Sequence, residues 1–315
     1  MRVALFLLSV VALVLGGYLA ITGYFLANRS ASILTVGPLA TALAQADQPE
    51  DPLVIGYIGN PTDALGLPFQ SVKIETPLGP AEAWLVPAAG PEKGRAIYVH
   101  GIAGTRANGF RQLSMLHEAG WAVLMITYRN HDGAPKAPDG RYGFGINEWP
   151  DLEAAVAFFA RDAGPGLLVV AESMGAAVLG QFLAQSPIAD RVQAIALDSP
   201  AVSFSAVTRQ LAEMSGYPFA GLTAWVAGRV LPWMTGVPLD QAEVTAVYEA
   251  FPGPLFIAHG AGDQIVPLAP SQALAEARSA PTATLWTGSD HLASYAEDPA
   301  AYQAAFRAFL AILAP

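Results

Sequence analysis

A serine, an aspartate and a histidine follow one another along the chain, each just after a stretch that predicts a buried strand. Ser173 lies in "LLVVAESMGAAVLG", Asp263 in "FIAHGAGDQIVP" and His291 in "LWTGSDHLASY". A serine hydroxyl becomes an effective nucleophile when an imidazole takes its proton and a carboxylate orients that imidazole. These three residue types therefore predict nucleophilic attack on an acyl carbon, provided that the fold brings them together.

The serine stands at an abrupt change from strand to helix. Ala171 and Gly175 place small residues two positions before and two positions after Ser173. A sharp turn of this kind strains the backbone of the nucleophile, and larger neighbours at those positions would clash. The helix that follows directs its free N–H groups towards the serine. The alternative interpretation is that Ser173 only caps this helix.

A loop with two glycines, "YVHGIAG", follows the strand predicted at residues 95–101. Its glycines allow the loop to fold tightly beside the serine, with Gly101 against the substrate. We expect the backbone N–H groups of Ile102 and Met174 to form an oxyanion hole, which stabilises a tetrahedral intermediate. His100 comes too early in the chain to be the base, and we expect it to order this loop.

A second carboxylate competes for the role of the acid. Asp198 ends the preceding strand in "ALDSP", whereas Asp263 lies in a glycine-rich loop after the next strand. We prefer Asp263 as the partner of His291. Asp290 is next to the histidine in the sequence, and we expect its side chain to face solvent.

Four further residues are expected to contact the substrate or the wall of the site. Glu172 directly precedes the nucleophile, and it contacts the substrate or the cap unless it pairs with a residue of the cap. His131 follows the strand predicted at 122–128 and lies near the expected mouth of the site. Phe204 and Trp225 belong to an aromatic-rich stretch. They contact substrate unless these aromatic side chains only form a small core of their own.

Apolar strands alternate with helices from residue 71 onwards, which predicts an α/β fold with a mostly parallel sheet covered on both faces. A hairpin turning at Gly79 and Pro80 precedes this pattern. The long stretch between Pro200 and Pro254 shows no strong strand, and we expect it to form a helical cap over the carboxyl ends of the strands. The strands are expected at 95–101, 122–128, 167–173, 192–200, 254–260 and 283–288, and the helices at 109–120, at 148–164, from 174, and at the end of the chain.

The first segment, "RVALFLLSVVALVLGGYLAITGYFLA", carries no charge after Arg2. A helix of about 25 apolar residues spans about 37 Å, enough to cross a bilayer core of about 30 Å. The apolar stretch of a cleaved signal peptide, which is the alternative, has only about 7–15 residues. Acidic residues dominate the sequence that follows. By the positive-inside rule, we expect a cytoplasmic N-terminus and a catalytic domain outside the cytoplasm.

Composition excludes several classes of function. The 315-residue chain has 16 Lys and Arg against 26 Asp and Glu, so it lacks the basic surface that binds nucleic acid. It contains no cysteine, which excludes disulfides, thiolate nucleophiles and cysteine zinc sites. The stretch "HEAG" lacks the second histidine of a helical zinc motif, and "GIAGTRANG" has the wrong glycine spacing for a dinucleotide site. We therefore expect no metal and no cofactor.

The motifs "HGIAG", "AESMGA", "HGAGDQIVP" and "GSDH" follow in the order and spacing of the α/β-hydrolase superfamily, and residues 71–315 resemble its esterase and lipase group. With "YRNHDGAP", "EWPDLEAAV" and the apolar N-terminus, the chain is similar to a bacterial membrane-anchored branch of serine hydrolases. The resemblance implies the α/β-hydrolase fold. The expected parts are a transmembrane anchor at 1–27, a connector at 28–70, a hydrolase core at 71–200 and 254–315, and a helical cap at 201–253.

These observations predict hydrolysis of a carboxylic ester, or a related acyl bond, through an acyl-enzyme. Ser173 attacks, His291 acts as base and then as acid, and Asp263 orients His291. Dehalogenase activity is disfavoured because it requires a carboxylate nucleophile. Peptidase and thioesterase activities stay open, as does a catalytically silent anchored binding domain. A cap with few charges predicts a small-molecule ester with an apolar acyl group as substrate, with the membrane as a partner, and leaves open whether the enzyme is lipase-like or a short-chain esterase. The sequence does not indicate an oligomeric state.

Overall fold

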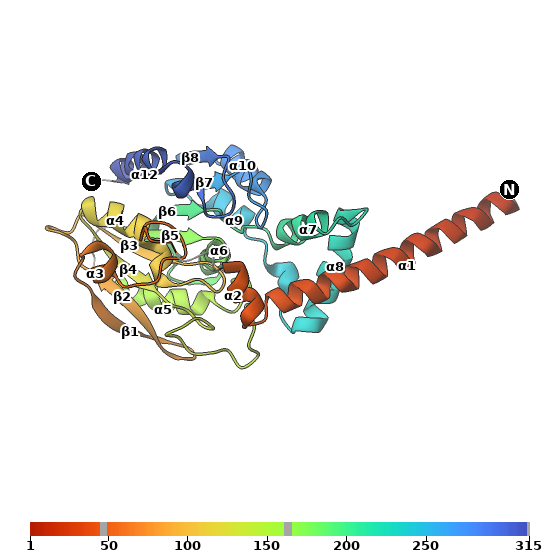
Figure 1. The fold of residues 1–315 in the computed structure, drawn as a ribbon, viewed down its shortest axis with the longest axis horizontal. Coiled ribbons are helices and arrows are strands. Elements are labelled where there is room, and N and C mark those ends of the chain that lie inside the picture. The colour runs from red at the N-terminus through yellow and green to blue at the C-terminus, as the bar shows by residue number, and fades with distance from the viewer. Residues whose placement is uncertain (45–48, 161–165, 314–315) are drawn as a thin grey trace.

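The computed structural model describes residues 1–44, 49–160 and 166–313. These residues form three parts: an α/β core, a helical region at one end of the core, and a long helix that projects away from both (Figure 1). The N-terminus lies at the far end of the projecting helix.

The core is built on one sheet of eight strands. The strands are β1 (Gln70–Thr76), β2 (Gly79–Val86), β3 (Gly94–Val99), β4 (Trp121–Ile126), β5 (Leu167–Glu172), β6 (Val192–Asp198), β7 (Leu255–Gly260) and β8 (Thr282–Thr287). Their order in the sheet is β1-β2-β4-β3-β5-β6-β7-β8. β2 runs antiparallel to its two neighbours, and the other adjacent pairs are parallel. This arrangement confirms the mostly parallel sheet predicted from the sequence.

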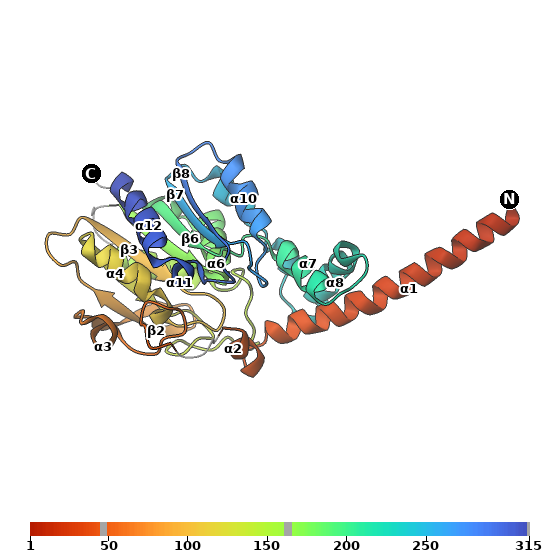
Figure 2. The same ribbon diagram turned by 45° about the horizontal axis from the view of Figure 1, so that its top comes forward.

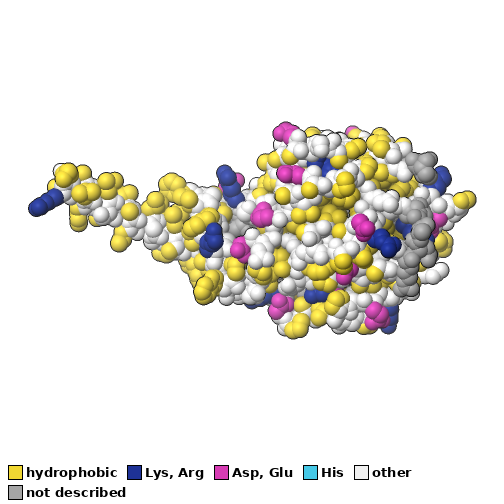
Figure 3. All heavy atoms as spheres, turned by 180° about the vertical axis from the view of Figure 1, so that it is seen from behind, with side chains coloured by type: hydrophobic (Ala, Val, Ile, Leu, Met, Phe, Trp, Pro, Cys, Tyr) yellow, Lys and Arg dark blue, Asp and Glu magenta, His cyan; other side chains and the backbone are white. Residues whose placement is uncertain are grey.

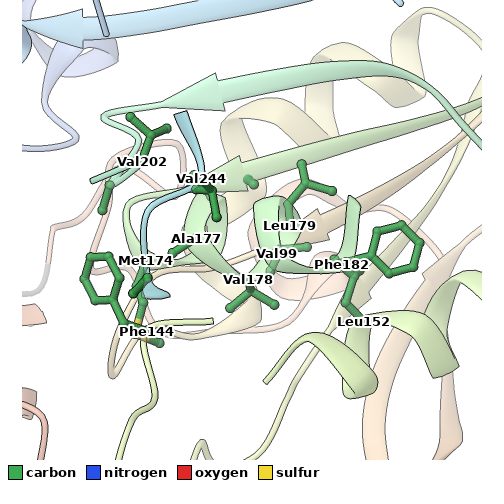
Figure 4. Close-up of a cluster of buried hydrophobic side chains, with 14 of the residues drawn as sticks. Val99, Phe144, Leu152, Met174, Ala177, Val178, Leu179, Phe182, Val202 and Val244 are labelled. Carbon is green, nitrogen blue, oxygen red and sulfur yellow. The ribbon is translucent and has the colours of Figure 1, made fainter. Parts of the chain in front are cut away.

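Helices cover both faces of this sheet, and each face has its own apolar core. α4 (Phe110–Glu118) and α12 (Pro299–Leu313) pack on one face. α5 (Trp149–Phe159) and α6 (Met174–Gln185) pack on the other. Figure 4 shows the apolar side chains of α6 meeting those of β3 and α5. The buried strands thus hold the segments that follow them in fixed positions.

The structure places most elements where the sequence predicts them. The helix predicted at 109–120 begins with a 3-10 turn, Arg106–Gly109, before α4. The helix predicted at 148–164 corresponds to α5, which ends at Phe159, and residues 161–165 lie outside the described residues. Four short helices that the sequence analysis did not predict are α2 (Pro38–Ala44), α3 (Pro61–Leu65), α10 (Leu268–Ala277) and α11 (Ser294–Glu297).

The long stretch between β6 and β7 is helical, as expected. It contains α7 (Phe204–Met214), α8 (Ala220–Thr235) and α9 (Thr245–Ala250). α9 lies against the core, where the hydroxyl of Tyr248 donates a hydrogen bond to Ala176 O. α7 and α8 stand out from the core beside the projecting helix (Figure 2). We call α7 and α8 the cap, and the exact limits of the domains stay a prediction.

The projecting helix, α1 (Arg2–Ile33), is longer than the anchor predicted at 1–27. Its N-terminal half is exposed on all sides and mostly apolar (Figure 3), whereas its C-terminal half packs against α8. The helix continues past the apolar run because protein contacts support its last turns. The helix is long enough to cross a membrane, and its mean hydropathy of 2.5 over an 18-residue window makes it apolar enough to do so. A signal sequence shares these properties.

Candidate active site

Ser173 lies between β5 and α6 in a strained backbone conformation, with φ of 48° and ψ of −122°. Residues with a Cβ rarely adopt this region. The surroundings leave no room for larger neighbours: a Cβ on Gly175 would lie 2.5 Å from Val99 O, and one on Gly101 would lie 3.0 Å from the Cβ of Ser173. The serine is therefore held on a sharp turn, in the geometry that its small neighbours predict.

Three side chains form a hydrogen-bonded row at the carboxyl ends of the strands. His291 Nε2 lies 2.9 Å from Ser173 Oγ, and His291 Nδ1 lies 2.7 Å from Asp263 Oδ2. Asp263 follows β7 and His291 follows β8, so parallel strands bring them to the same edge of the sheet. The loop that carries the histidine is fixed by Leu292, whose N–H donates to Ser199 Oγ at 3.0 Å. The structure thus brings together the three residues that the sequence analysis singled out.

The carboxylate of Asp263 is buried but surrounded by donors. Its Oδ1 accepts hydrogen bonds from the N–H groups of Ile265 at 2.9 Å and Val266 at 2.8 Å. Burial alone would raise the pKa of Asp263, but the hydrogen bonds from His259 and His291 hold it well below its usual range. Asp263 is therefore charged at neutral pH and able to orient His291.

The contact from His259 is one that the sequence analysis missed. His259 is fully buried on β7, and its Nε2 lies 3.1 Å from Asp263 Oδ2 and 3.1 Å from Val266 O. A carbonyl only accepts hydrogen bonds, so Nε2 carries the proton and donates. Nδ1, 2.8 Å from Ser271 Oγ, then accepts. The spacing of four residues between His259 and Asp263 was the available signal.

The two residues expected to supply the oxyanion donors come from the loop after β3 and from the start of α6. Met174 is the first residue of α6, so its N–H has no acceptor within the helix. Ile102 and Met174 line the same cavity. The loop before Ile102 is held by Tyr128, whose hydroxyl donates to His100 O at 2.9 Å, and Ala103 takes a positive φ of 49° in the turn that follows. The role of the two N–H groups stays a prediction.

A cavity of about 80 Å³ lies beside the serine. Its wall is almost entirely apolar and comes from the core, the cap and the end of α1. Phe204, which was expected to contact substrate, belongs to this wall. The lining residues are Ser30, Ile33, Leu34, Ile102, Phe144, Ser173, Met174, Ala201, Phe204, Val207, Thr208, Leu211, Ile265 and Val266. The contribution of α1 was not predicted from the sequence.

The expectation that Glu172 contacts the substrate or the cap is wrong. Glu172 is fully buried and points towards α4, where it accepts hydrogen bonds from Gln112 Nε2 at 3.0 Å and from Arg111 Nη2. On its other oxygen, the hydroxyl of Tyr98 donates at 2.6 Å. Tyr98 belongs to β3, and Arg111 and Gln112 belong to α4. The side chain of Glu172 therefore lies between the sheet and α4, and not in the cavity.

Asp198, the alternative acid, belongs to the same buried group. It accepts from Arg111 Nη2 at 3.1 Å and from the hydroxyl of Tyr302 at 2.8 Å. One guanidinium thus lies between two carboxylates. Burial raises the pKa of Glu172 to about 7, since the charge of Asp198 adds to the rise and Arg111 opposes it only in part. Asp198 therefore belongs to a buried ionic cluster, and Asp263 is the carboxylate that contacts His291.

His131 is also absent from the cavity wall. It is buried with its ring 4.5 Å from the ring of His100 and 4.3 Å from that of Tyr128, measured between centroids. Its Nδ1 lies 3.1 Å from Tyr128 O. Burial lowers the pKa of His131 to about 4, so the ring is neutral at physiological pH. Its position supports the loop and does not reach the substrate space.

Trp225, expected to face substrate, lies on the outside of the cap. It is 61% exposed, and the guanidinium of Arg229 lies 5.4 Å from the centroid of its ring. It lines a separate open groove of about 600 Å³ on α7 and α8. Phe204 and Thr208 line both the groove and the cavity beside the serine, so this part of α7 forms the partition between them.

Within the described residues, no group of three or more His, Cys, Asp or Glu side chains could hold a metal ion. The site as described consists of the serine, the histidine, the aspartate and an apolar cavity. It offers a hydroxyl nucleophile with a neighbouring imidazole, next to a space for an apolar group.

Comparisons with known proteins agree with this architecture. The sequence model of the alpha/beta hydrolase fold family matches residues 97–236. A comparison with curated proteins finds no match to the sequence.

Among solved structures, the chain is similar to the esterase Pf2001 of Pyrococcus furiosus, with 19% identity, a TM-score of 0.62, and coverage of 84% of this chain and 99% of that one. It is also similar to XC6422 from Xanthomonas campestris, described as an α/β serine hydrolase without a lid, with 15% identity, a TM-score of 0.55, and coverage of 78% and 95%. Est1E from Butyrivibrio proteoclasticus, solved with ferulic acid, shares 18% identity with a TM-score of 0.58, over 77% of this chain and 98% of that one.

Proposed function

Since the chain has the α/β-hydrolase fold, we propose that it is a serine hydrolase that cleaves carboxylic esters through an acyl-enzyme. The observation that supports this proposal best is the row in which His291 Nε2 lies 2.9 Å from Ser173 Oγ and His291 Nδ1 lies 2.7 Å from Asp263 Oδ2. Both distances are within the range of direct hydrogen bonds.

In the proposed reaction, His291 takes the proton of Ser173 as the hydroxyl oxygen attacks the ester carbonyl carbon. The tetrahedral intermediate places its negative oxygen near the N–H groups of Ile102 and Met174. His291 then gives its proton to the departing alcohol, which leaves an acyl group on the serine. Water activated by the same imidazole hydrolyses this acyl-enzyme and restores the hydroxyl. Asp263 stays charged throughout and stabilises the imidazolium.

The cavity beside the serine supports a small, apolar acyl group. Its volume of about 80 Å³ corresponds to two or three groups of the size of water, at about 30 Å³ each. An acyl group with about two or three carbons beyond its carbonyl fits this space, and the alcohol part of the ester extends outside it. Relatives of the same fold include esterases by name, which agrees with a small-molecule ester as substrate.

We further propose that α1 anchors the enzyme in a membrane, with the catalytic domain on the non-cytoplasmic side. The exposed N-terminal half of the helix carries apolar side chains on all faces, as expected of a segment surrounded by lipid. Arg2 is the one charged side chain before Arg29.

Labelling of the detergent-solubilised protein with a small fluorophosphonate tests this function. We expect the wild type to be labelled at Ser173 and to hydrolyse p-nitrophenyl acetate. Ser173→Ala removes the label, and His291→Ala slows labelling by at least about 10³-fold. Ser114→Ala and His117→Ala, which change the same residue types on α4 outside the cavity, serve as matched controls. Equal labelling of Ser173→Ala would refute the assignment of the nucleophile, and a folded wild type without label or activity would favour a silent binding domain.

A further inference from the structure

The C-terminal half of α1 is fixed to the cap by contacts spread along it. The hydroxyl of Tyr18 donates a hydrogen bond to Pro218 O at 3.0 Å, and Arg29 donates to Ser215 Oγ at 3.0 Å. Between these contacts α1 and α8 come very close, since a Cβ on Gly23 would lie 2.7 Å from the Cβ of Val226 on α8. Small residues allow such an approach between helices. The end of α1 therefore has a defined position against the cap.

The same end of the helix is joined to the core. The N–H of Tyr142 donates to Leu34 O at 2.8 Å, just after the last turn of α1. Ser30, Ile33 and Leu34 then line the cavity together with Ser173. The segment that we assign to the membrane anchor thus ends as one wall of the space next to the nucleophile.

One group on this wall has no partner. Ser30 Oγ is buried and makes no hydrogen bond with any residue that the structure describes. Other hydroxyls of α1 behave differently: those of Ser9, Thr22 and Ser32 each donate to the carbonyl four residues earlier, at 2.8 to 3.0 Å. A helical serine can form this local bond, but the hydroxyl of Ser30 does not form it among the described residues, and a buried hydroxyl without a partner is destabilising. Ser30 lines the cavity, so we infer that its partner is an atom of the bound substrate.

We propose that the last turn of α1 is a wall of the acyl pocket and that Ser30 determines specificity there. Its hydroxyl, which donates or accepts, selects a short acyl group that carries a hydroxyl or oxo oxygen. This inference rests on the proposed serine hydrolase function and names the substrate class of the same site. An acyl chain without such an oxygen leaves the hydroxyl with no partner in the cavity, and sites built to bond a substrate oxygen discriminate against analogues that lack it.

The test compares two p-nitrophenyl esters, 3-hydroxybutyrate and butyrate, on the full-length protein in detergent. We expect the wild type to have the higher kcat/KM for 3-hydroxybutyrate. Ser30→Ala is expected to lower the ratio of the two kcat/KM values by about threefold to tenfold, as one lost hydrogen bond predicts. Ser32→Ala is the matched control because Ser32 is exposed on the same helix and bonds to Asn28 O. It is expected to keep the wild-type ratio.

A second pair of variants tests the wall itself. Leu34→Ala enlarges the cavity, and we expect it to raise the ratio of hexanoate to butyrate hydrolysis by at least about threefold, since a methylene in an apolar pocket is worth tenfold or more. Leu39→Ala, on the exposed side of α2, is expected to leave the ratio unchanged.

Fluorophosphonate labelling separates the inference from the function on which it rests. If the wild type and all four variants are labelled at Ser173 but the two ratios do not change, α1 does not shape the pocket and the proposed hydrolase function stands. A ratio that changes equally in Ser30→Ala and Ser32→Ala also overturns the role of Ser30. If the wild type neither reacts nor turns over ester, the hydrolase function fails and the inference fails with it.

Discussion

Replacing Arg111 by leucine should lower the free energy of unfolding, because Arg111 pairs with both carboxylates of the buried ionic cluster next to Ser173. Arg111 is 1% exposed and donates to both Glu172 and Asp198, whose side chains are also buried. It also donates to Asn108 O at 2.8 Å. Removing one partner of a buried ion pair costs about 3–5 kcal/mol, because the remaining charge has lost its compensation. We expect a loss of unfolding free energy of about this size at pH 7.

The pH dependence of that loss gives a sharper test. The pKa of Glu172 is about 7 in the folded protein, against about 4.3 for an unfolded chain. The folded state therefore holds an extra proton between these values, so stability falls as pH rises through this window and becomes level above pH 7. Without the guanidinium the pKa of Glu172 rises further. The fall then continues above pH 7 at about 1.4 kcal/mol per pH unit, or about 2 kcal/mol by pH 8.5.

Equilibrium urea unfolding in detergent, followed by tryptophan fluorescence at pH 5.5, 7.0 and 8.5, measures both effects. Arg209→Leu is the control: Arg209 is 65% exposed and pairs with Glu213 on the same helix, a contact worth less than about 1 kcal/mol. Parallel stability curves for the wild type and Arg111→Leu between pH 7.0 and 8.5 would refute the argument, since Arg111 would then not support the charge of Glu172.

Three further predictions concern single substitutions and, for two of them, a matched control. Gly175→Ala should lower the unfolding free energy by about 1–3 kcal/mol through its clash with the backbone of β3, whereas Gly228→Ala, in open space on α8, should raise it by up to about 1 kcal/mol; denaturant unfolding decides both. His259→Phe removes a donor to the carboxylate of the proposed acid. Because burial then opposes that charge with one hydrogen bond fewer, the pKa of Asp263 should rise towards its usual range, which an NMR titration of its carboxyl carbon measures. Gly23→Leu should separate α1 from α8 and lower the melting temperature by several degrees, while Gly16→Leu, with no atom near it, should not.

Features that depend on local chain geometry were predictable from the sequence. The small neighbours of Ser173 predict the sharp turn, because a strand that turns directly into a helix leaves little room for side chains beside the serine; the space at Gly175 is taken by the backbone at the end of β3. The chain order of the three polar residues, each after a strand, predicts their meeting because parallel strands end at a common edge. His291 and Asp263 lie in contact for that reason.

Features that depend on distant partners were not predictable. Glu172 turns to Arg111, a residue 61 positions away, and no local pattern shows this pairing. The outward position of Trp225 depends on which face of α8 packs against α1 and α7. The role of α1 in the cavity was not predicted, because its apolar sequence was interpreted only as a membrane-spanning segment. Its small and hydroxyl residues, such as Thr22 and Gly23, are the signal for a helix that also packs against protein.

The docking of α1 on the cap sets the order in which the site can mature during synthesis. Tyr18 and Pro218, which are joined by a hydrogen bond, are 200 residues apart. At about 5–20 residues per second, the cap leaves the ribosome about 10 to 40 s after the helix. Throughout that interval the helix lacks its partner, and no nascent chain has a complete cavity. The segment that is synthesised first therefore completes the cavity wall only after the cap has been made. The selectivity for the acyl group that depends on this wall is acquired at the end of folding.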